Sequence, residues 1–491
     1  MGEQGQSLVD LFQELDAELH SGLLKRERLE EVFRRYTDFQ FPMPPPYPGE
    51  MELTAVYCEG MIDKVQLNEY FVGLCQFVLQ PSDADASLPF EMPLMQCGES
   101  MEEMLEGLLG GSLILYVAGE TRFWMVHVAK VPQRSMQESN TEISIKGPRD
   151  AFTEELFTNI SLVRKRLRTA HLYCEQFVAG SLTSTRIALL YLEHKADPTM
   201  VKEARSRLEK LQTEAVVSSG QLEQWIADKT FALFPLLDYI GRPDFIVETL
   251  LRGRFAIIVD GSPMVLIGPS NFLELLKTPE DVHYPYYHVA VQRFLRLIGM
   301  VISIALPGFW LAIASVNLDQ IPFSLVSTVV ISRNGVPLPM FLESLLLIFL
   351  FELLREAGVR LPKAVGQTIG IVGGLIIGDA LIRAGLASPT LLVVIAISSV
   401  ATYSLVNQSL IGSVSLFRTA TLLASAYLGI YGFFLAMFGL LIYMCRLESF
   451  GLAYLEPIVS LQFRDWLAGI ASNPFKRKEF TAEMIENKKE K

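Results

Sequence analysis

The sequence predicts a multi-domain membrane protein: an N-terminal soluble α+β region with two subdomains, followed by an α-helical transmembrane bundle. Half of the 491 residues are hydrophobic, and the mean hydropathy is positive at +0.32. The apolar residues concentrate after about residue 292, whereas residues 1–290 carry the charge of an ordinary globular region. Apolar runs long enough to cross a bilayer lie in the second part.

Composition excludes several classes of function. A net charge of −12 argues against nucleic acid as the main partner. The five cysteines form no CxxC pair and no metal-type spacing, so reduced, buried thiols are expected. No nucleophile–base arrangement and no cofactor motif stands in a credible context, so we expect no enzyme activity, no catalytic residues, no cofactor and no metal. The first apolar run, from Ser7, lacks a basic start and a cleavage site, which places the soluble region on the cytoplasmic side.

Residues 1–50 are expected to be a helical extension followed by a linker. Apolar and charged residues alternate at helical spacing over residues 6–38, which predicts one or two amphipathic helices. The proline-rich run that starts at Phe41 cannot continue a helix and predicts a semi-rigid linker.

Residues 51–145 are expected to form the first α+β subdomain. Apolar runs predict strands over 53–58, 111–118 and 122–128, and the short turn between the last two predicts an antiparallel hairpin. A helix is expected over 65–79.

A linking helix over 155–167 is expected within residues 146–170. It ends in the basic run Arg164-Lys165-Arg166. Such a run is either a solvated helix face or a contact for a phosphate or lipid headgroup, and the spacing alone leaves both open.

The second subdomain is expected over residues 171–290. The pattern predicts a strand over 186–192, helices over 199–211 and from 221, and a hairpin of strands 254–260 and 264–267. Tyrosines surround His283 and His288, which is more typical of an interfacial aromatic belt than of a metal site.

The transmembrane domain is expected over residues 291–447, with an interfacial cytoplasmic tail over 448–491. Five hydrophobic segments stand out, at residues 294–316, 340–354, 366–385, 389–405 and 417–445. Basic residues flank the first segment, follow the second and fill the tail, so all three places should be cytoplasmic. Four full spans satisfy this if 366–385 does not cross and is buried or lines water. A sixth crossing at 321–331 is the alternative.

Glycines recur every fourth residue in the third of these segments, at Gly366, Gly370, Gly374 and Gly378, and we call these four residues the glycine ladder. On a helix they form one stripe, which lets backbones approach closely in a bilayer. Two acidic residues in or near the ladder could pair with a basic residue on the same helix face. Asp379 lies four positions before Arg383, and Glu352 lies three positions before Arg355.

Glu343 has no such local partner. An acid without a local partner in an apolar segment often marks a cation path. The candidate pore or gating residues are therefore Gly366, Gly370, Gly374, Gly378, Asp379, Arg383, Glu343 and Glu352. Structural pairing remains the alternative for the charged ones.

Six stretches spread from about residue 50 to 385 match one known family. They are Glu59–Asp63, Gly147–Glu154, Asn159–Arg166, Arg242–Arg254 with Val259–Gly261, Leu354–Pro362, and the ladder with Ala384-Gly385. Through them the chain resembles the A subunits of the GerA-type spore germination receptors of endospore-forming bacteria.

The resemblance implies a location in the spore inner membrane, with several spans and the N-terminal region facing the spore core. It implies partners: a transporter-like B subunit, a lipoprotein C subunit, membrane lipid and further copies of the chain. Such oligomers would form a germinant-gated cation channel that triggers germination.

Three other functions remain in competition. A related branch of the family sits in spore membranes and would amplify ion release without sensing nutrients. A non-conducting signalling scaffold would need no polar path. A secondary transporter usually shows two related halves, and the absence of a second ladder in this sequence counts against it.

Overall fold

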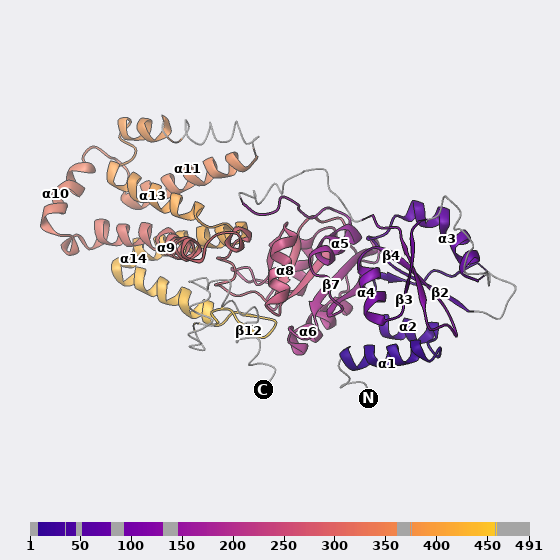
Figure 1. Cartoon of the computed structure of the whole chain (residues 1–491). Coiled ribbons are helices and arrows are strands. Elements are labelled where there is room, and N and C mark those ends of the chain that lie inside the picture. Colours follow the sequence, from indigo (N-terminus) through magenta and orange to yellow (C-terminus); the bar gives the residue numbers. More distant parts are fainter. Residues whose placement is uncertain are drawn as a thin grey trace. The chain divides into compact units, whose positions relative to one another are not determined.

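The computed structural model describes most of the chain and is shown in Figure 1. The described residues are 8–34, 36–45, 52–79, 93–130, 146–360, 374, 376–456 and 458. They form two compact units. The first unit contains Met1–Thr230 and Leu237–Pro269, and the second contains Phe231–Leu236 and Ser270–Lys478. The second unit therefore begins before residue 291, where the transmembrane domain was expected to start.

The first sheet of the first unit has the strand order β1-β2-β4-β5-β3, with every pair antiparallel. Its elements are α1 Leu8–His20, α2 Arg26–Phe33, β1 Phe39–Gln40, β2 Leu53–Cys58, α3 Lys64–Leu79, β3 Met95–Gly98, α4 Met101–Leu109, β4 Ser112–Val117 and β5 Phe123–His127. Apolar residues of α3 pack against β2, β4 and β5 in one core. The three predicted strands and the predicted helix are confirmed.

The second sheet has the order β6-β7-β9-β10-β8, again antiparallel. Its elements are α5 Leu156–Arg166, β6 Leu172–Ala179, β7 Thr185–Leu192, α6 Pro198–Glu209, α7 Ser219–Ile226, β8 Asp238–Ile240, α8 Pro243–Leu251, β9 Phe255–Val259 and β10 Val265–Gly268. Helices α5 and α8 share a core with the strands. Every residue of β9 and β10 is buried, because their runs are purely apolar apart from a glycine.

Helices α4 and α8 and strands β3, β6 and β8 were not predicted. A capping signal for α4 was present in the sequence: the Ser100 side chain accepts a hydrogen bond from the Glu103 backbone N–H, and acids fill the first turn. The same device begins the predicted α6, where the Asp197 side chain accepts from Thr199 N–H at 2.7 Å and Pro198 opens the helix.

The basic run at the end of α5 has a structural role that neither sequence interpretation anticipated. Arg164 is 1% exposed, and its guanidinium donates to Asp38 from Nε at 2.5 Å and from Nη2 at 2.9 Å. Thr37 donates its backbone N–H to Cys174 O in β6. Residues 37–38 therefore tie the linking helix and the second sheet to β1 of the first sheet. Lys165 alone of the run is exposed, because Arg166 pairs with Asp150.

Cys58 and Cys174 lie beside this buried ion pair, in surroundings that are typical of reduced, unreactive cysteines. Burial raises the pKa of the Cys58 thiol well above its usual value, and the nearby Asp38 raises it further. Cys58 and Cys174 are both buried and free of disulfides. Their surroundings therefore suit packing better than reactivity.

The second unit is a bundle of apolar helices, which together with the two sheets of the first unit confirms the predicted fold class. Its elements are η1 Pro279–Val282, α9 Tyr286–Leu311, the π-helical η2 Ala312–Val316, η3 Leu318–Gln320, α10 Phe323–Ser332, α11 Met340–Arg360, α13 Pro389–Tyr403, α14 Gln408–Cys445, β11 Glu448–Ser449 and β12 Leu452–Ala453. Figure 1 shows α9, α11 and α13 side by side in this unit. Among the described residues, Tyr286–Val316 and Gln408–Cys445 are long and apolar enough to cross a membrane.

Helix α14 is broken at Gly429, whose φ of 61° and ψ of −140° are not helical. The two halves fold back on each other. The rings of Phe417 in the first half and Tyr443 in the second lie 5.9 Å apart, and Gly432 lies against the Ala424 backbone. The break is held by Asn317, whose Oδ1 accepts the N–H of Ile430 at 3.0 Å and so caps the second half.

Contacts between the helices give the direction of each pass through the bundle. Helix α13 runs antiparallel to α9, because Gly299 lies against Ser404 while Ser303, further along α9, contacts the earlier Ser398. The first half of α14 runs parallel to α9, since Thr421 Oγ1 donates to Ile304 O while Ser425, further along α14, lies against Gly308, further along α9.

Helix α11 starts at the end of the bundle where α13 starts, because Glu343 contacts Ser388, and it ends near Tyr403. Gly385 lies next to Gly335 O, at the first of these two ends. Arg360 and Gly385 therefore lie at opposite ends of the bundle, and residues 361–373 and 375 lie outside the described residues.

This arrangement differs from the preferred interpretation of four spans. The segment 417–445, counted from sequence as one pass, belongs to a hairpin of two passes. The basic flanks at Arg293, Arg360 and Arg446 lie at one end of the bundle, and residues 366–373 and 375 of the segment 366–385 lie outside the described residues. The alternative crossing at 321–331 corresponds to the short helix α10.

Candidate functional site

Glu343 lies in the first turn of α11, is 0% exposed, and has a partner that the sequence did not indicate. Its Oε1 accepts hydrogen bonds from the backbone N–H of Ser388 at 2.5 Å and from Ser388 Oγ at 2.6 Å. Ser388 is the residue that precedes α13, so the carboxylate lies at the positive end of that helix. Its other oxygen, Oε2, has no hydrogen-bond partner among the described residues.

Glu352 joins α11 to α14. The predicted pairing with Arg355 is confirmed at 2.5 Å. The prediction missed a second partner, Arg418 in the first half of α14, which is 2% exposed and donates to Glu352 Oε1 together with Ser415 Oγ. An arginine inside the apolar segment 408–445 was the signal that could have identified it.

Asp379 and Arg383 form the predicted i,i+4 ion pair, with 2.7 Å between Oδ2 and Nε. Their side chains are 59% and 79% exposed in this chain. The pair therefore lies on an outer face of the helical residues 376–383 and does not point into the bundle of a single chain.

The described part of the glycine ladder does not pack closely within this chain. No described atom lies within 4 Å of a Cβ placed at Gly374, and only Leu392 lies near one placed at Gly378. Gly366 and Gly370 lie outside the described residues. The expected close helix contacts occur elsewhere, at Gly299 and Gly308 of α9.

Hydroxyl groups line the contacts of α9 with α13 and α14. Ser303 Oγ and Thr402 Oγ1 lie 2.5 Å apart, and Ser398 Oγ donates to Ser303 O at 2.9 Å. Ser425 Oγ donates to Thr421 O within α14. These bonds satisfy buried polar groups inside an apolar bundle and fix the helices against one another.

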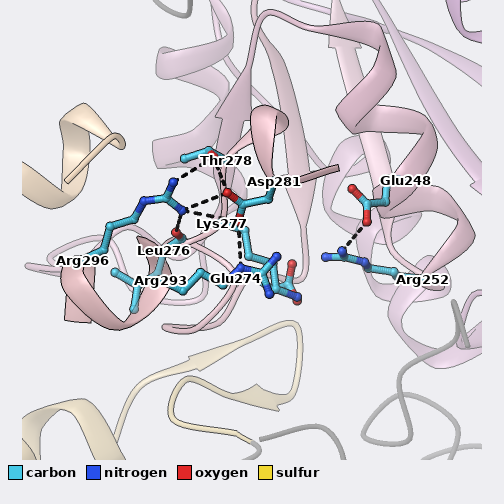
Figure 2. Close-up of polar contacts among 9 residues, drawn as sticks. All are labelled: Glu248, Arg252, Glu274, Leu276, Lys277, Thr278, Asp281, Arg293 and Arg296. Atoms are coloured by element: carbon cyan, nitrogen blue, oxygen red, sulfur yellow. Dashed lines mark hydrogen bonds and ion pairs between the residues drawn. The ribbon is translucent and has the colours of Figure 1, made fainter. Parts of the chain in front are cut away.

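Asp281 fixes the start of α9, as Figure 2 shows. It accepts from Arg293 Nε at 2.8 Å and from Arg296 Nη1 at 3.1 Å, and Thr278 Oγ1 donates to it at 2.7 Å. Arg296 also donates to Leu276 O. Burial alone would raise the pKa of Asp281, but the two guanidinium groups hold it below the usual value. The two arginines of the basic flank before the first hydrophobic segment are thus buried in ion pairs.

The first unit contains a cavity of about 670 Å³ between α1, α4 and residues 168–171. Its lining includes the acids Asp16, Glu102 and Glu106 and the basic residue Arg168, together with His171. A volume of this size suits a small organic molecule.

A two-sheet α+β unit joined to an apolar bundle with buried carboxylates defines the class of protein: a membrane-associated protein whose bundle carries charge. The chain matches the family model described as Bacillus/Clostridium GerA spore germination protein over residues 27–483, and it belongs to this family. The resemblance inferred from the residues is thereby confirmed.

The matches with individual relatives cover most of this chain and most of each relative. Spore germination protein XA of Bacillus anthracis is 42% identical over 428 residues, which cover 86% of this chain and 87% of the relative. Spore germination protein KA of Bacillus subtilis (strain 168) is 34% identical and covers 83% and 76%. The uncharacterized membrane protein YfkQ of the same strain is 32% identical and covers 88% and 90%.

Among solved structures, the crystal structure of the N-terminal domain of the A subunit of the Bacillus megaterium spore germinant receptor GerK3 is 28% identical to this chain. The match covers 51% of this chain and 96% of that domain, with a TM-score of 0.37.

Proposed function

We propose that this chain is the A subunit of a nutrient germinant receptor in the spore inner membrane, with the first unit on the core side. Its helical unit would line a germinant-gated path for monovalent cations once several copies assemble. Family membership supports the role in germination, and the names of several relatives agree with it.

The observation that carries the cation path is Glu343. Burying a carboxylate that is 0% exposed among apolar helices costs free energy, and acids in such positions usually have a functional role. One oxygen is held by Ser388, while the other has no described partner and can meet a passing cation. A ring of such oxygens in an oligomer would attract cations and repel anions.

The proposed membrane topology has six crossings: α9, α11, the passage from residue 360 to 388, α13, and the two halves of α14. It places every basic flank on the core side, which satisfies the positive-inside rule. The exposed side of the described ladder, with Gly374, Gly378 and Asp379, is then available to another subunit. We propose that this side contacts a second copy of the chain, with the B and C subunits completing the receptor.

The test is Glu343→Gln, which keeps an acceptor for Ser388 and removes the charge. A unit charge about 5 Å from an ion is worth on the order of 3 kcal/mol at an effective dielectric constant of 20. Monovalent cation release from germinating spores should therefore slow by about tenfold or more. Asp319→Asn is the matched control, because that acid is exposed in η3 and belongs neither to the proposed path nor to the proposed contact between copies.

Membrane extracts blotted for the A subunit and its partners show whether each variant assembles. An assembled Glu343→Gln receptor with wild-type cation release contradicts the proposed path. The scaffold alternative predicts that result. The branch of the family that amplifies release without sensing nutrients predicts slower release after every trigger, including triggers that bypass nutrients.

The cavity in the first unit supports a second proposal. We propose that it binds a small molecule that carries one positive and one negative charge, such as an amino acid. Arg168→Ala should then abolish any shift in the unfolding temperature that a panel of amino acids causes in the purified full chain. Lys165→Ala, an exposed cation outside the cavity, is the control. Equal shifts in all three proteins would exclude this site.

A further inference from the structure

A small cavity lies among α11, α13 and α14, where Glu352 joins two of these helices. Its volume is about 10 Å³, which is close to the room that one water-sized particle needs. The lining residues are Phe351, Glu352, Arg355, Ser399, Thr402, Tyr403 and Arg418. The cavity is separate from Glu343, which contacts the other end of α13.

Two hydrogen-bond donors of the lining residues are unused. Arg418 Nε and Ser399 Oγ are buried and have no partner among the described residues. Arg418 is 2% exposed and Ser399 is 5% exposed, so bulk water does not satisfy them. Buried donors in native proteins are almost always paired, which indicates that a particle absent from the protein chain accepts from both.

The charge of the lining side chains decides what kind of particle this is. Glu352 uses Oε2 for Arg355 and Oε1 for Arg418, so one carboxylate serves two guanidinium groups. The three side chains carry a formal net charge of +1. Arg418 is 2% exposed, whereas the side chains of Glu352 and Arg355 are 23% and 26% exposed. A surplus positive charge at this partly buried position is unfavourable, and an anion cancels it where a neutral water molecule cannot.

We propose that this cavity binds one small monovalent anion of the halide class. The size excludes phosphate, sulfate and lipid headgroups, and the surplus of donors over acceptors disfavours a cation. The bound anion joins α13 to α14 beside the Glu352 ion pairs, and it stabilises the core-side half of the bundle. The inference does not depend on whether the bundle conducts cations.

Thermal unfolding of the purified full chain in lipid nanodiscs tests this. Sodium chloride or bromide is titrated against sodium gluconate at constant ionic strength, so that general salt effects are held fixed. Chloride and bromide should raise the unfolding midpoint in a saturable way, and gluconate should not. Chloride-35 NMR line broadening that bromide reverses reports the same binding directly.

Ser399→Ala removes one donor without changing the charge. A hydrogen bond to a charged group is worth enough that the apparent halide affinity should fall by about tenfold or more. The matched control is Ser398→Ala, the preceding residue of α13, whose hydroxyl donates to Ser303 O instead of lining the cavity. This control should keep the wild-type halide affinity.

Each outcome has a defined meaning. Identical unfolding curves in chloride and gluconate mean that water fills the cavity, and they overturn the proposal. A Ser399→Ala protein that unfolds at a lower temperature but keeps the wild-type halide affinity also overturns it. Loss of affinity in Ser399→Ala together with retention in Ser398→Ala supports it.

Discussion

Replacing Gly429 with alanine should destabilise the bundle by about 2–5 kcal/mol. The backbone at Gly429, with φ of 61° and ψ of −140°, lies near a region that is essentially restricted to glycine, and occupying it with another residue costs about 1–3 kcal/mol. The added Cβ would also lie 2.4 Å from Asn317 Oδ1 and 2.8 Å from Val316 Cγ1. Asn317 must move, and losing its hydrogen bond to the N–H of Ile430 costs a further free energy of about 0.5–2 kcal/mol.

The measurement is the thermal unfolding midpoint of the purified full chain, together with its yield in membranes. Gly439→Ala is the matched control in the same helix, because no described atom lies within 4 Å of a Cβ at that position. It should be neutral or slightly stabilising, since alanine favours a helix over glycine. Equal midpoints for the two variants would refute the hairpin geometry at Gly429.

Three further predictions follow from buried charges and from the ladder. Asp38→Ala leaves Arg164 buried without its carboxylate and should cost about 3–5 kcal/mol, measured by denaturant unfolding, whereas a loss below 1 kcal/mol or so would show that the pair is dispensable. Asp281→Asn should lower stability near neutral pH. The folded pKa of Asp281 lies below its usual value of 3.8, so the stability that the carboxylate contributes is complete above pH 3.8 and is lost as the pH falls through the folded pKa. The unfolding midpoints of the wild type and the variant should therefore converge in acid. A difference that stays constant with pH would contradict this reasoning. Gly378→Leu should leave the unfolding midpoint of a single chain nearly unchanged, because the position is open, but should reduce co-purification of differently tagged copies; undiminished co-purification would remove the ladder from the proposed contact.

Local sequence patterns predicted those parts of the molecule that depend on neighbouring residues. The strands β2 and β4 follow from short apolar runs, and the pairs Glu352–Arg355 and Asp379–Arg383 follow from helical spacing. The bonds that join different helices were not predictable in this way. Ser388 is 45 residues from Glu343, and the fold alone brings them together.

The hairpin in α14 was missed because one glycine in an apolar run looks like part of a continuous helix. Its length was a usable signal. A straight helix over the 29 residues of the predicted segment 417–445 would be about 44 Å long, which exceeds the apolar thickness of about 30 Å. The sequence therefore already favoured two passes over one.

The bond between Asp38 and Arg164 has a practical consequence for dissecting this protein. A fragment that starts at residue 51 looks like a sensible trim, because it begins after the proline-rich run. It would discard Asp38 and leave a guanidinium that is 1% exposed without its counter-ion. It would also strip Thr37 from the edge of β6 and open that strand to pairing with other chains. Fragments for biochemistry should therefore begin before Tyr36, and shorter ones are expected to aggregate.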